Sequence, residues 1–215
     1  MDIQPIIGGA IPRNRETNLE MRSHSQAALL AAARHLFAER GYASCTISEI
    51  ARAAGMSQGN VYWYFASKEE LLKAVLADGF GGLEMLLEKA AARPGTAIEK
   101  LNILLDEYLL FARERDDFTT IFLSLTAQGG AERLRQLGFD TPQIGMRYHR
   151  HVASILAQGQ QEGTIAGVDP EILTMFFFAF FNGLMLTYRA DWTKVPPDII
   201  RQALFRLIDC STEMV

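Results

Sequence analysis

Cysteine and histidine are scarce in this sequence of 215 residues, which holds two cysteines and four histidines. Cys45 and Cys210 lie far apart in the chain, a pattern that argues against a disulfide framework and against a zinc site. His149 and His151 are separated by about 200° around an α-helix, so they cannot share one ion. We therefore expect neither a bound metal nor another cofactor.

A long hydrophobic run is also missing. The most apolar stretch, residues 172–188, reads ILTMFFFAFFNGLMLTY, and it is shorter than the roughly 20 residues that a membrane-spanning helix needs. Asn182 and Gly183 interrupt it. The opening residues, MDIQPIIGGAIPRNR, lack the basic leader and the continuous apolar segment of a secretory signal. These absences predict a soluble, cytoplasmic protein with no membrane partner.

Neither sign of charge dominates the chain as a whole. The net charge is −4, and the hydrophobic and charged fractions of 49% and 21% are those of an ordinary globular protein. The distribution is uneven, because residues 13–68 hold seven Lys and Arg against four Asp and Glu. A mildly basic first third on an acidic body is a modest indication of polarity between the two parts.

Amphipathic helices are predicted over most of the chain, and no segment reads as a credible strand. Residues 1–21 contain prolines and glycines without an apolar period, so we expect a mobile arm. A first helix begins at Arg22 and ends at Gly41. Thr46 and Glu49 form the capping box of a second, short helix.

The second helix stops at Gly55, and Ser57 is placed to cap a third after a tight turn. Another capping box, Ser67 with Glu70, opens a long helix that ends at Pro94-Gly95. Further helices are expected over residues 96–114, 118–128, 141–163, 170–188 and 199–210, with Thr141 capping the third of these and Pro142 at its first position. The predicted fold is all-α, with about nine helices.

The aromatic stretch SQGNVYWYF, residues 57–65, has strong strand propensity but lies between two helix-start signals. A strand here would have no partner in the first ninety residues, and its backbone amides would stay unsatisfied. In a helix, Val61 and Phe65 share one inward face. We therefore predict a short helix.

The same helical phase turns Gln58, Gly59, Tyr62 and Trp63 outward. Three helices with a tight turn before the third match the helix-turn-helix unit that enters the major groove of DNA. Gln58 can pair with an adenine edge, and the glycine lets the backbone come close. Tyr62 and Trp63 can reach phosphates and sugars.

Other polar groups of this region suit phosphate contacts. They are the Lys68 ammonium, the Thr46 hydroxyl and the amides at the two helix starts, while Asn60 is either a polar contact or a partner of the cap. Tyr64 has two readings, a core side chain with a wet hydroxyl or a DNA contact. Arg22 is either a solvated charge or part of an arm that enters a minor groove.

The stretch TISEIARAAGMSQGNVYWYFASKEELL resembles the signature of the TetR family of bacterial transcriptional regulators, T-x-x-x-I-A-x-x-A-G-x-S-x-G-x-x-Y-x-Y-F-x-S-K-E-x-L. The match covers about residues 25 to 75. It implies a DNA-binding domain (22–68), an effector-binding and dimerisation domain (69–215), and a homodimer on palindromic, double-stranded operator DNA that a small molecule releases. By motif position, the DNA-facing residues are Thr46, Ser57, Gln58, Gly59, Tyr62, Trp63, Tyr64 and Lys68. The family often has His or Lys where Gln58 or Trp63 stand, so phosphate contacts there are expected to be weaker.

The resemblance also implies that the last two helices pair with their copies in a four-helix bundle. Five phenylalanines in residues 176–181 point to all sides of one helix, which therefore needs apolar neighbours on all sides. The expected dimer residues are Phe176, Ala179, Phe180, Gly183, Leu204, Leu207 and Ile208. An aromatic cavity for a largely apolar effector is expected to involve Tyr108, Phe111, Phe118, Phe122, Met146, Phe177, Phe181 and Met185.

Two alternatives to a ligand-responsive repressor remain at this point. A constitutive DNA-binding regulator would use its second domain for dimerisation alone, and a solidly packed interior would favour it. An all-helical enzyme is disfavoured, because the sequence holds no nucleophile–base pair and no phosphate loop.

Overall fold

The computed structural model describes residues 15–165, 167–188 and 194–208. Its regular elements within these ranges are nine α-helices, as the all-α prediction required. They are α1 (Arg15–Arg40), α2 (Ile47–Ala53), α3 (Gln58–Tyr64), α4 (Lys68–Ala92), α5 (Ala97–Glu114), α6 (Asp116–Gln136), α7 (Thr141–Gln161), α8 (Pro170–Tyr188) and α9 (Pro197–Leu207). No described helix is long and apolar enough to cross a membrane.

The first helix begins earlier than the sequence suggested. It starts at Arg15 rather than Arg22, because the segment RETNLEM contains mostly good helix formers and follows the last proline of this region. The arm predicted for residues 1–21 is therefore too long, and residues 1–14 lie outside the described part. Gly41 ends the helix with φ 80°, the left-handed conformation expected after a helix C-terminus.

Local caps fix the two short helices of the first domain. Thr46 and Glu49 form both halves of the predicted capping box at α2. The Ser57 hydroxyl accepts a hydrogen bond from the Asn60 amide at the start of α3. Between the two helices, Gly55 adopts φ 68° and allows the tight turn. Val61 is fully buried on the inner side of α3.

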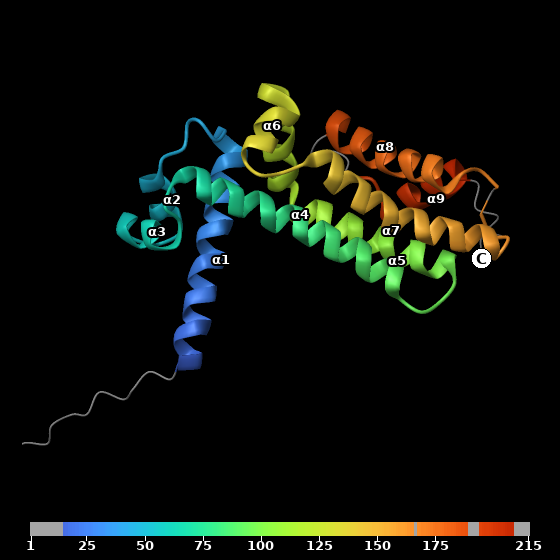
Figure 1. The fold of residues 1–215 in the computed structure, drawn as a ribbon, viewed down its shortest axis with the longest axis horizontal. Helices are drawn as coiled ribbons and strands as arrows, with labels where there is room; N and C mark the ends of the chain where they lie inside the picture. The colour runs from blue at the N-terminus through green and yellow to red at the C-terminus, as the bar shows by residue number, and fades with distance from the viewer. Residues whose placement is uncertain (1–14, 166, 189–193, 209–215) are drawn as a thin grey trace, which may run out of the picture.

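The long helix α4 belongs to both domains. It begins beside α2 and α3 and runs into the second domain, where it packs against α5, α6 and α7 (Figure 1). Ser67 caps it by accepting from the Glu70 amide, but the Glu70 carboxylate accepts from Lys73 instead of returning to the cap. Only half of the predicted capping box therefore forms.

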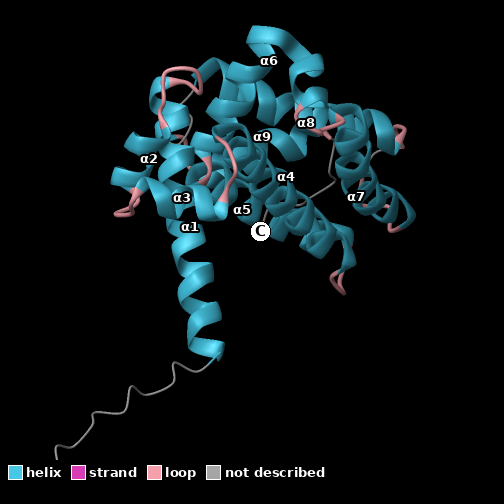
Figure 2. Ribbon diagram, turned by 60° about the vertical axis from the view of Figure 1, so that its left-hand side comes forward, coloured by secondary structure: helices cyan, strands magenta, loops and turns pink. Residues whose placement is uncertain are grey.

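Helices α5 to α9 form the second domain. Helix α7 packs against α4 and α5 on one side and α8 on the other, while α9 contacts α5 and α8. Helix α6 reaches back to α1, whose first half projects away from the rest of the molecule in both ribbon views (Figures 1 and 2). The second domain is thus joined to the first domain through both α4 and α6.

Some predicted helix limits differ from the structure. Helix α6 extends past residue 128 to Gln136, and Gly130 within it takes the left-handed φ of 59° that a glycine can adopt. The side chain that caps α7 is Asp140, whose Oδ1 accepts from the Gln143 amide, and not Thr141. The last helix ends at Leu207, and the predicted end at Cys210 lies outside the described residues.

Candidate nucleic-acid interface and effector cavity

The outer face of α3 carries the side chains that the sequence assigned to DNA. Gln58, Gly59 and Asn60 are exposed, and Tyr62 and Trp63 keep 49% and 59% of their surface in contact with solvent. Two large neighbouring aromatics are unusual in water, since such side chains normally contribute to a core or an interface. Val61 and Phe65 are buried and anchor the helix from below.

Gly59 has no role in the packing of this chain. A Cβ atom at this position would meet only the Ser57 hydroxyl oxygen, at an ordinary 3.9 Å, and the backbone is not in the left-handed region. A glycine inside a helix costs about 0.5–1 kcal/mol relative to alanine. The absence of an internal reason for Gly59 agrees with close approach by an external partner.

Trp63 is held in place by its neighbours. The Arg22 guanidinium carbon stands 4.1 Å from the centre of the Trp63 ring, and the Tyr64 ring meets that ring edge-on at 4.8 Å. Tyr64 itself is partly buried against the hydrophobic core, which is the first of its two expected readings. Arg22 is exposed and lies on α1, not in an arm.

The two capping hydroxyls have protein partners. Thr46 donates its hydroxyl proton to Glu49 Oε2 at 2.7 Å, and its amide donates to the same oxygen at 2.9 Å. These bonds hold the pKa of the Glu49 carboxyl below its ordinary value. Thr46 and Ser57 are both exposed at the starts of α2 and α3. Any phosphate contact by Thr46 would compete with Glu49 for that proton.

Lys68 differs from the sequence-based expectation. Its Nζ donates to the carbonyl oxygens of Tyr42, Ala43 and Cys45 at 2.9, 3.3 and 2.8 Å. The ammonium also lies 4.5 Å from the centre of the Tyr42 ring. Because an ammonium has three protons, these carbonyls satisfy it completely. Lys68 therefore holds the α1–α2 loop to the start of α4, and the predicted phosphate contact is replaced by this structural role.

A cavity of about 230 Å³ lies among α4, α5, α6, α7 and α8 of the second domain. Of the eight residues predicted to bind an effector, Tyr108, Phe118 and Phe122 line it. The other lining residues were not predicted from the sequence, although Ile144 and Tyr148 stand four apart on α7 and so share one face. The full lining is Phe80, Leu83, Tyr108, Phe118, Thr119, Phe122, Thr141, Ile144, Gly145, Tyr148, His149, Phe178 and Asn182.

The five other predicted effector residues lie elsewhere. Phe177 and Phe181 are fully buried and pack against Tyr108 as ordinary core. Met146 is 61% exposed on α7. The side of α7 that faces the cavity carries Ile144 and Tyr148 instead. The Phe111 ring contacts Gly82 outside the cavity, and Met185 packs against the core.

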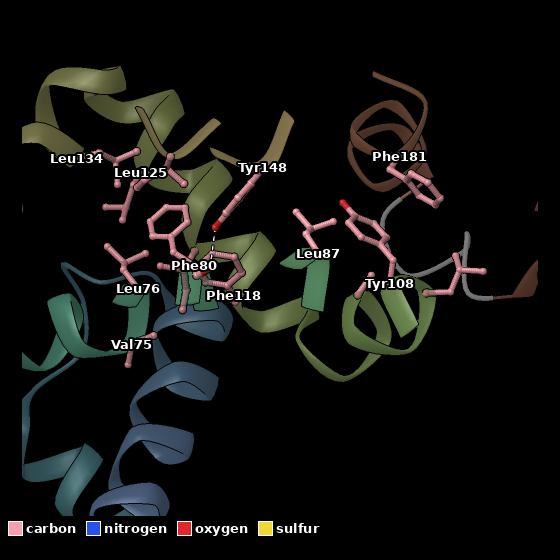
Figure 3. Close-up of a cluster of buried hydrophobic side chains, with 14 of the residues drawn as sticks. Val75, Leu76, Phe80, Leu87, Tyr108, Phe118, Leu125, Leu134, Tyr148 and Phe181 are labelled. Atoms are coloured by element: carbon pink, nitrogen blue, oxygen red, sulfur yellow. Dashed lines mark hydrogen bonds between the residues drawn. The ribbon is translucent and has the colours of Figure 1, made fainter. Parts of the chain in front are cut away.

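Aromatic rings from α4 and α6 form one wall of this cavity. The Phe80 ring meets those of Phe118 and Phe122 edge-on at 5.3 and 5.6 Å. Figure 3 shows Phe80 and Phe118 beside Tyr148, whose hydroxyl donates to the Phe80 carbonyl oxygen at 2.7 Å. The Phe118 ring lies directly on Gly79, where a Cβ atom would come within 2.1–2.5 Å of it. Helices α4 and α6 therefore touch through a glycine that has no room for a side chain.

Another cavity, of about 300 Å³, opens between the end of α1 and α6. Its charged lining residues already have protein partners, since Arg133 lies 3.6 Å from Glu69 and Glu132 pairs with Arg135. We therefore take the aromatic cavity of the second domain as the candidate effector site. No cluster of three or more metal-ligating side chains occurs among the described residues.

The residues predicted for a dimer interface divide into two sets. Phe176, Ala179, Gly183 and Leu207 are exposed, and Phe180 is partly buried. Leu204 and Ile208 are 0% exposed within the single chain, so they fill its own core rather than meet a partner. These two residues of the α9 segment are buried because α9 packs against α5 and α8 of the same chain.

The first domain thus defines a helix-turn-helix DNA-binding regulator with a separate helical domain. Residues 29–75 match the family model of the bacterial regulatory proteins of the tetR family, and residues 94–207 match that of the tetracyclin repressor-like C-terminal domain. The chain belongs to the TetR family of transcriptional regulators.

Individual relatives agree with this assignment. The fatty acid metabolism regulator protein of Bacillus subtilis is 24% identical over 74% of this chain and 81% of its own length. The regulator TtgR of Pseudomonas putida is 27% identical over 84% and 85%. A putative fatty acid metabolism regulator of Clostridium perfringens is 23% identical and similar in fold, with a TM-score of 0.69 over 87% of this chain and 100% of that chain.

Proposed function

We propose that this protein binds a palindromic operator as a homodimer and is released from it by a small-molecule effector. The observation that carries the proposal is the outer face of α3, where Gln58, Gly59, Tyr62 and Trp63 are exposed together. Neighbouring aromatics next to a glycine with no internal role suit a surface that receives a sugar-phosphate backbone and base edges.

An apolar stripe on α8 supports the dimer. Ile172, Met175, Phe176, Ala179 and Gly183 are all exposed, and they recur at three- and four-residue spacing on one face of the helix. A two-fold axis would place this stripe against its own copy, since such interfaces use the same patch on both subunits. The exposed Leu207 lies on α9, which packs beside α8.

A chain of ion pairs offers a route from the effector cavity to the DNA-binding domain. Asp78 on α4 pairs with Arg34 on α1 at 3.8 Å and with Arg115 at the start of α6. Nearby, Asp117 Oδ2 of α6 lies 3.7 Å from His35 Nδ1 of α1. An effector that shifts the start of α6 would therefore pull on α1, which carries Arg22 and its contact with Trp63.

The alternative is a constitutive regulator whose second domain only dimerises. The cavity favours an effector, because protein interiors are normally filled to crystal-like density. One solved structure of similar fold, a transcriptional regulator FadR from Bacillus subtilis, is a complex with stearoyl-CoA. It is 24% identical to this chain, with a TM-score of 0.62 over 85% of this chain and 96% of that one. Small-molecule control of this chain is consistent with that likeness.

The proposal is tested on the DNA that flanks the gene for this protein. Footprinting should show protection of an inverted repeat by the wild type, with half-sites about one helical turn, ~34–36 Å, apart. Tyr62→Ala should abolish this binding while circular dichroism shows an unchanged helix content. Equal binding by Tyr62→Ala and wild type would show that the outer face of α3 is not the DNA-binding surface. An effector must also bind less tightly to the DNA complex, by the factor by which it weakens DNA binding.

A further inference from the structure

The aromatic cavity has no charged wall. None of the residues that line it is an aspartate, a glutamate, a lysine or an arginine. Burying an unpaired carboxylate or phosphate in such a place costs far more than burying a neutral group. An anionic ligand would therefore need a cation from the rim.

Two arginines of α7 lie near this cavity. Arg150 lines the adjoining pocket on the exposed side of the helix, together with Met146 and Glu171, and is not part of the aromatic lining. The other arginine already has a partner. Arg147 follows Met146 on α7 and precedes the lining residue Tyr148. Its Nε donates to Glu84 Oε1 at 2.6 Å, and its Nη2 donates to Oε2 at 3.2 Å. This two-point pair with Glu84 raises the pKa of Arg147, which stays charged but neutralised by its partner. It does not supply a free positive charge to a ligand.

One unpaired hydroxyl indicates which group the ligand carries. Tyr108 lines the cavity and is 4% exposed as a residue, and no hydrogen bond to its hydroxyl occurs among the described residues. The hydroxyl oxygen is not among the fully buried atoms that lack a partner, so it remains accessible. A polar group in such apolar surroundings is normally paired. Tyr148, by contrast, donates its hydroxyl proton to the Phe80 carbonyl oxygen. Burial raises the pKa of both phenols, so both stay neutral and Tyr108 keeps a proton to donate.

The remaining walls suit a flat ring. Phe80, Phe118, Phe122 and Phe178 contribute aromatic surface, and the His149 ring stacks on Phe178 with the planes 5° apart and the centres 4.9 Å apart. The volume of about 230 Å³ is below the roughly 300–1,000 Å³ of common ligand pockets. Such a space suits a compact molecule of one or two fused rings.

We propose that the effector is a compact, uncharged aromatic molecule whose hydrogen-bonding group pairs with the Tyr108 hydroxyl, and that His149 helps to set this selectivity. The proposal rests on the proposed effector function of the second domain. It differs from that function in naming the charge, size and hydrogen-bonding partner of the ligand.

Three ring compounds of one size test the charge and the hydrogen bond. At neutral pH, 2-naphthol is uncharged, 2-naphthoate is an anion, and naphthalene lacks the polar group. Calorimetry with the full-length protein should show 2-naphthol binding at least about tenfold more tightly than 2-naphthoate and more tightly than stearate. Tyr108→Phe should weaken 2-naphthol about fivefold and leave naphthalene unchanged, because only one hydrogen bond is lost. Tighter binding of naphthoate or stearate, or no binding of 2-naphthol, would overturn the proposal.

A gain of affinity provides the complementary test. His149→Lys places a cation in the cavity wall and should raise naphthoate affinity about tenfold, whereas Met146→Lys adds the same charge on the exposed side of α7 and should not. An equal gain in both variants would contradict the proposed site.

Calorimetry and gel shift together separate the two proposals. If 2-naphthol binds through Tyr108 but DNA affinity stays constant, the effector function fails and the ligand class stands. If a charged or long-chain ligand releases DNA, the function stands and the ligand class fails.

Discussion

The Arg22 guanidinium lies over the face of the Trp63 ring, with its central carbon 4.1 Å from the ring centre, and so connects α1 to the exposed surface of α3. A cation above an exposed indole is worth about 0.5–1 kcal/mol. Together with the edge-on Tyr64 ring, this contact fixes the orientation of an exposed aromatic side chain. Arg22 therefore contributes to the candidate DNA-binding surface from α1, a helix that precedes the α2–turn–α3 unit.

Removing this contact should weaken DNA binding without unfolding the domain. We expect Arg22→Ala to lower operator affinity several-fold, with Arg22→Lys intermediate, because lysine keeps the charge but not the flat guanidinium. In a Trp192→Phe background, Trp63 is the only tryptophan left, and its fluorescence should change in Arg22→Ala. Unchanged fluorescence together with a salt slope reduced by about one unit would show that Arg22 is a simple phosphate contact instead.

Gly59→Ala should separate stability from DNA binding. The added methyl group meets only the Ser57 hydroxyl oxygen at 3.9 Å, and alanine favours a helix over glycine by up to about 1 kcal/mol. We expect an unchanged or higher melting temperature and a clear loss of operator affinity in the same sample. Full retention of DNA binding would show that the backbone at Gly59 does not approach DNA closely.

Lys68→Met should act on stability and not on electrostatics. The methionine matches the length of the lysine stem but leaves the carbonyl oxygens of Tyr42, Ala43 and Cys45 without their donor. We expect the first domain to lose about 1–3 kcal/mol of stability, measured by chemical denaturation. The salt dependence of the remaining DNA binding should match the wild type. A salt slope lower by about one unit with normal stability would restore the phosphate contact that the sequence suggested.

Gly79→Ala should disturb the contact between α4 and α6. Its methyl group would collide with the Phe118 ring, and overpacking of this kind costs about 1–3 kcal/mol. Gly81→Ala is the matched control, since it lies on the same helix, is exposed and has open space around it. We expect thermal denaturation to show a loss for Gly79→Ala alone. A Gly79→Ala protein as stable as Gly81→Ala would mean that Phe118 moves aside without cost.

The features that the sequence predicted correctly depend on neighbours in the chain. The phase of α3 follows from the Ser57 cap and from Val61 and Phe65 four residues apart, and all three occupy the expected places. The same holds for the Thr46–Glu49 box and for the glycine that ends α1. Each of these features spans only a few residues, so local physics determines it.

At the candidate sites, the errors concern partners that are distant in sequence. Lys68 donates to carbonyl oxygens more than twenty residues away, and the residues around it in the sequence do not predict these acceptors. The sequence pattern of Leu204 and Ile208 is the same whether they fill a core or an interface. The cavity lining was incomplete for a related reason, because the inward side of α7 and α8 depends on where α4 and α6 lie.

One of the carbonyl oxygens that accept from Lys68 belongs to Cys45, whose thiol is buried. The carbonyl oxygens of Leu36 and Gly41, 3.2 and 3.3 Å from the Cys45 Sγ, share its single thiol proton. Burial raises the pKa of this thiol. An alkylating reagent reacts with the exposed thiolate, so it reaches Cys45 only during transient opening of the first domain. In a Cys210→Ser protein, the rate of Cys45 labelling therefore reports how often the first domain opens. Bound operator should lower this labelling rate.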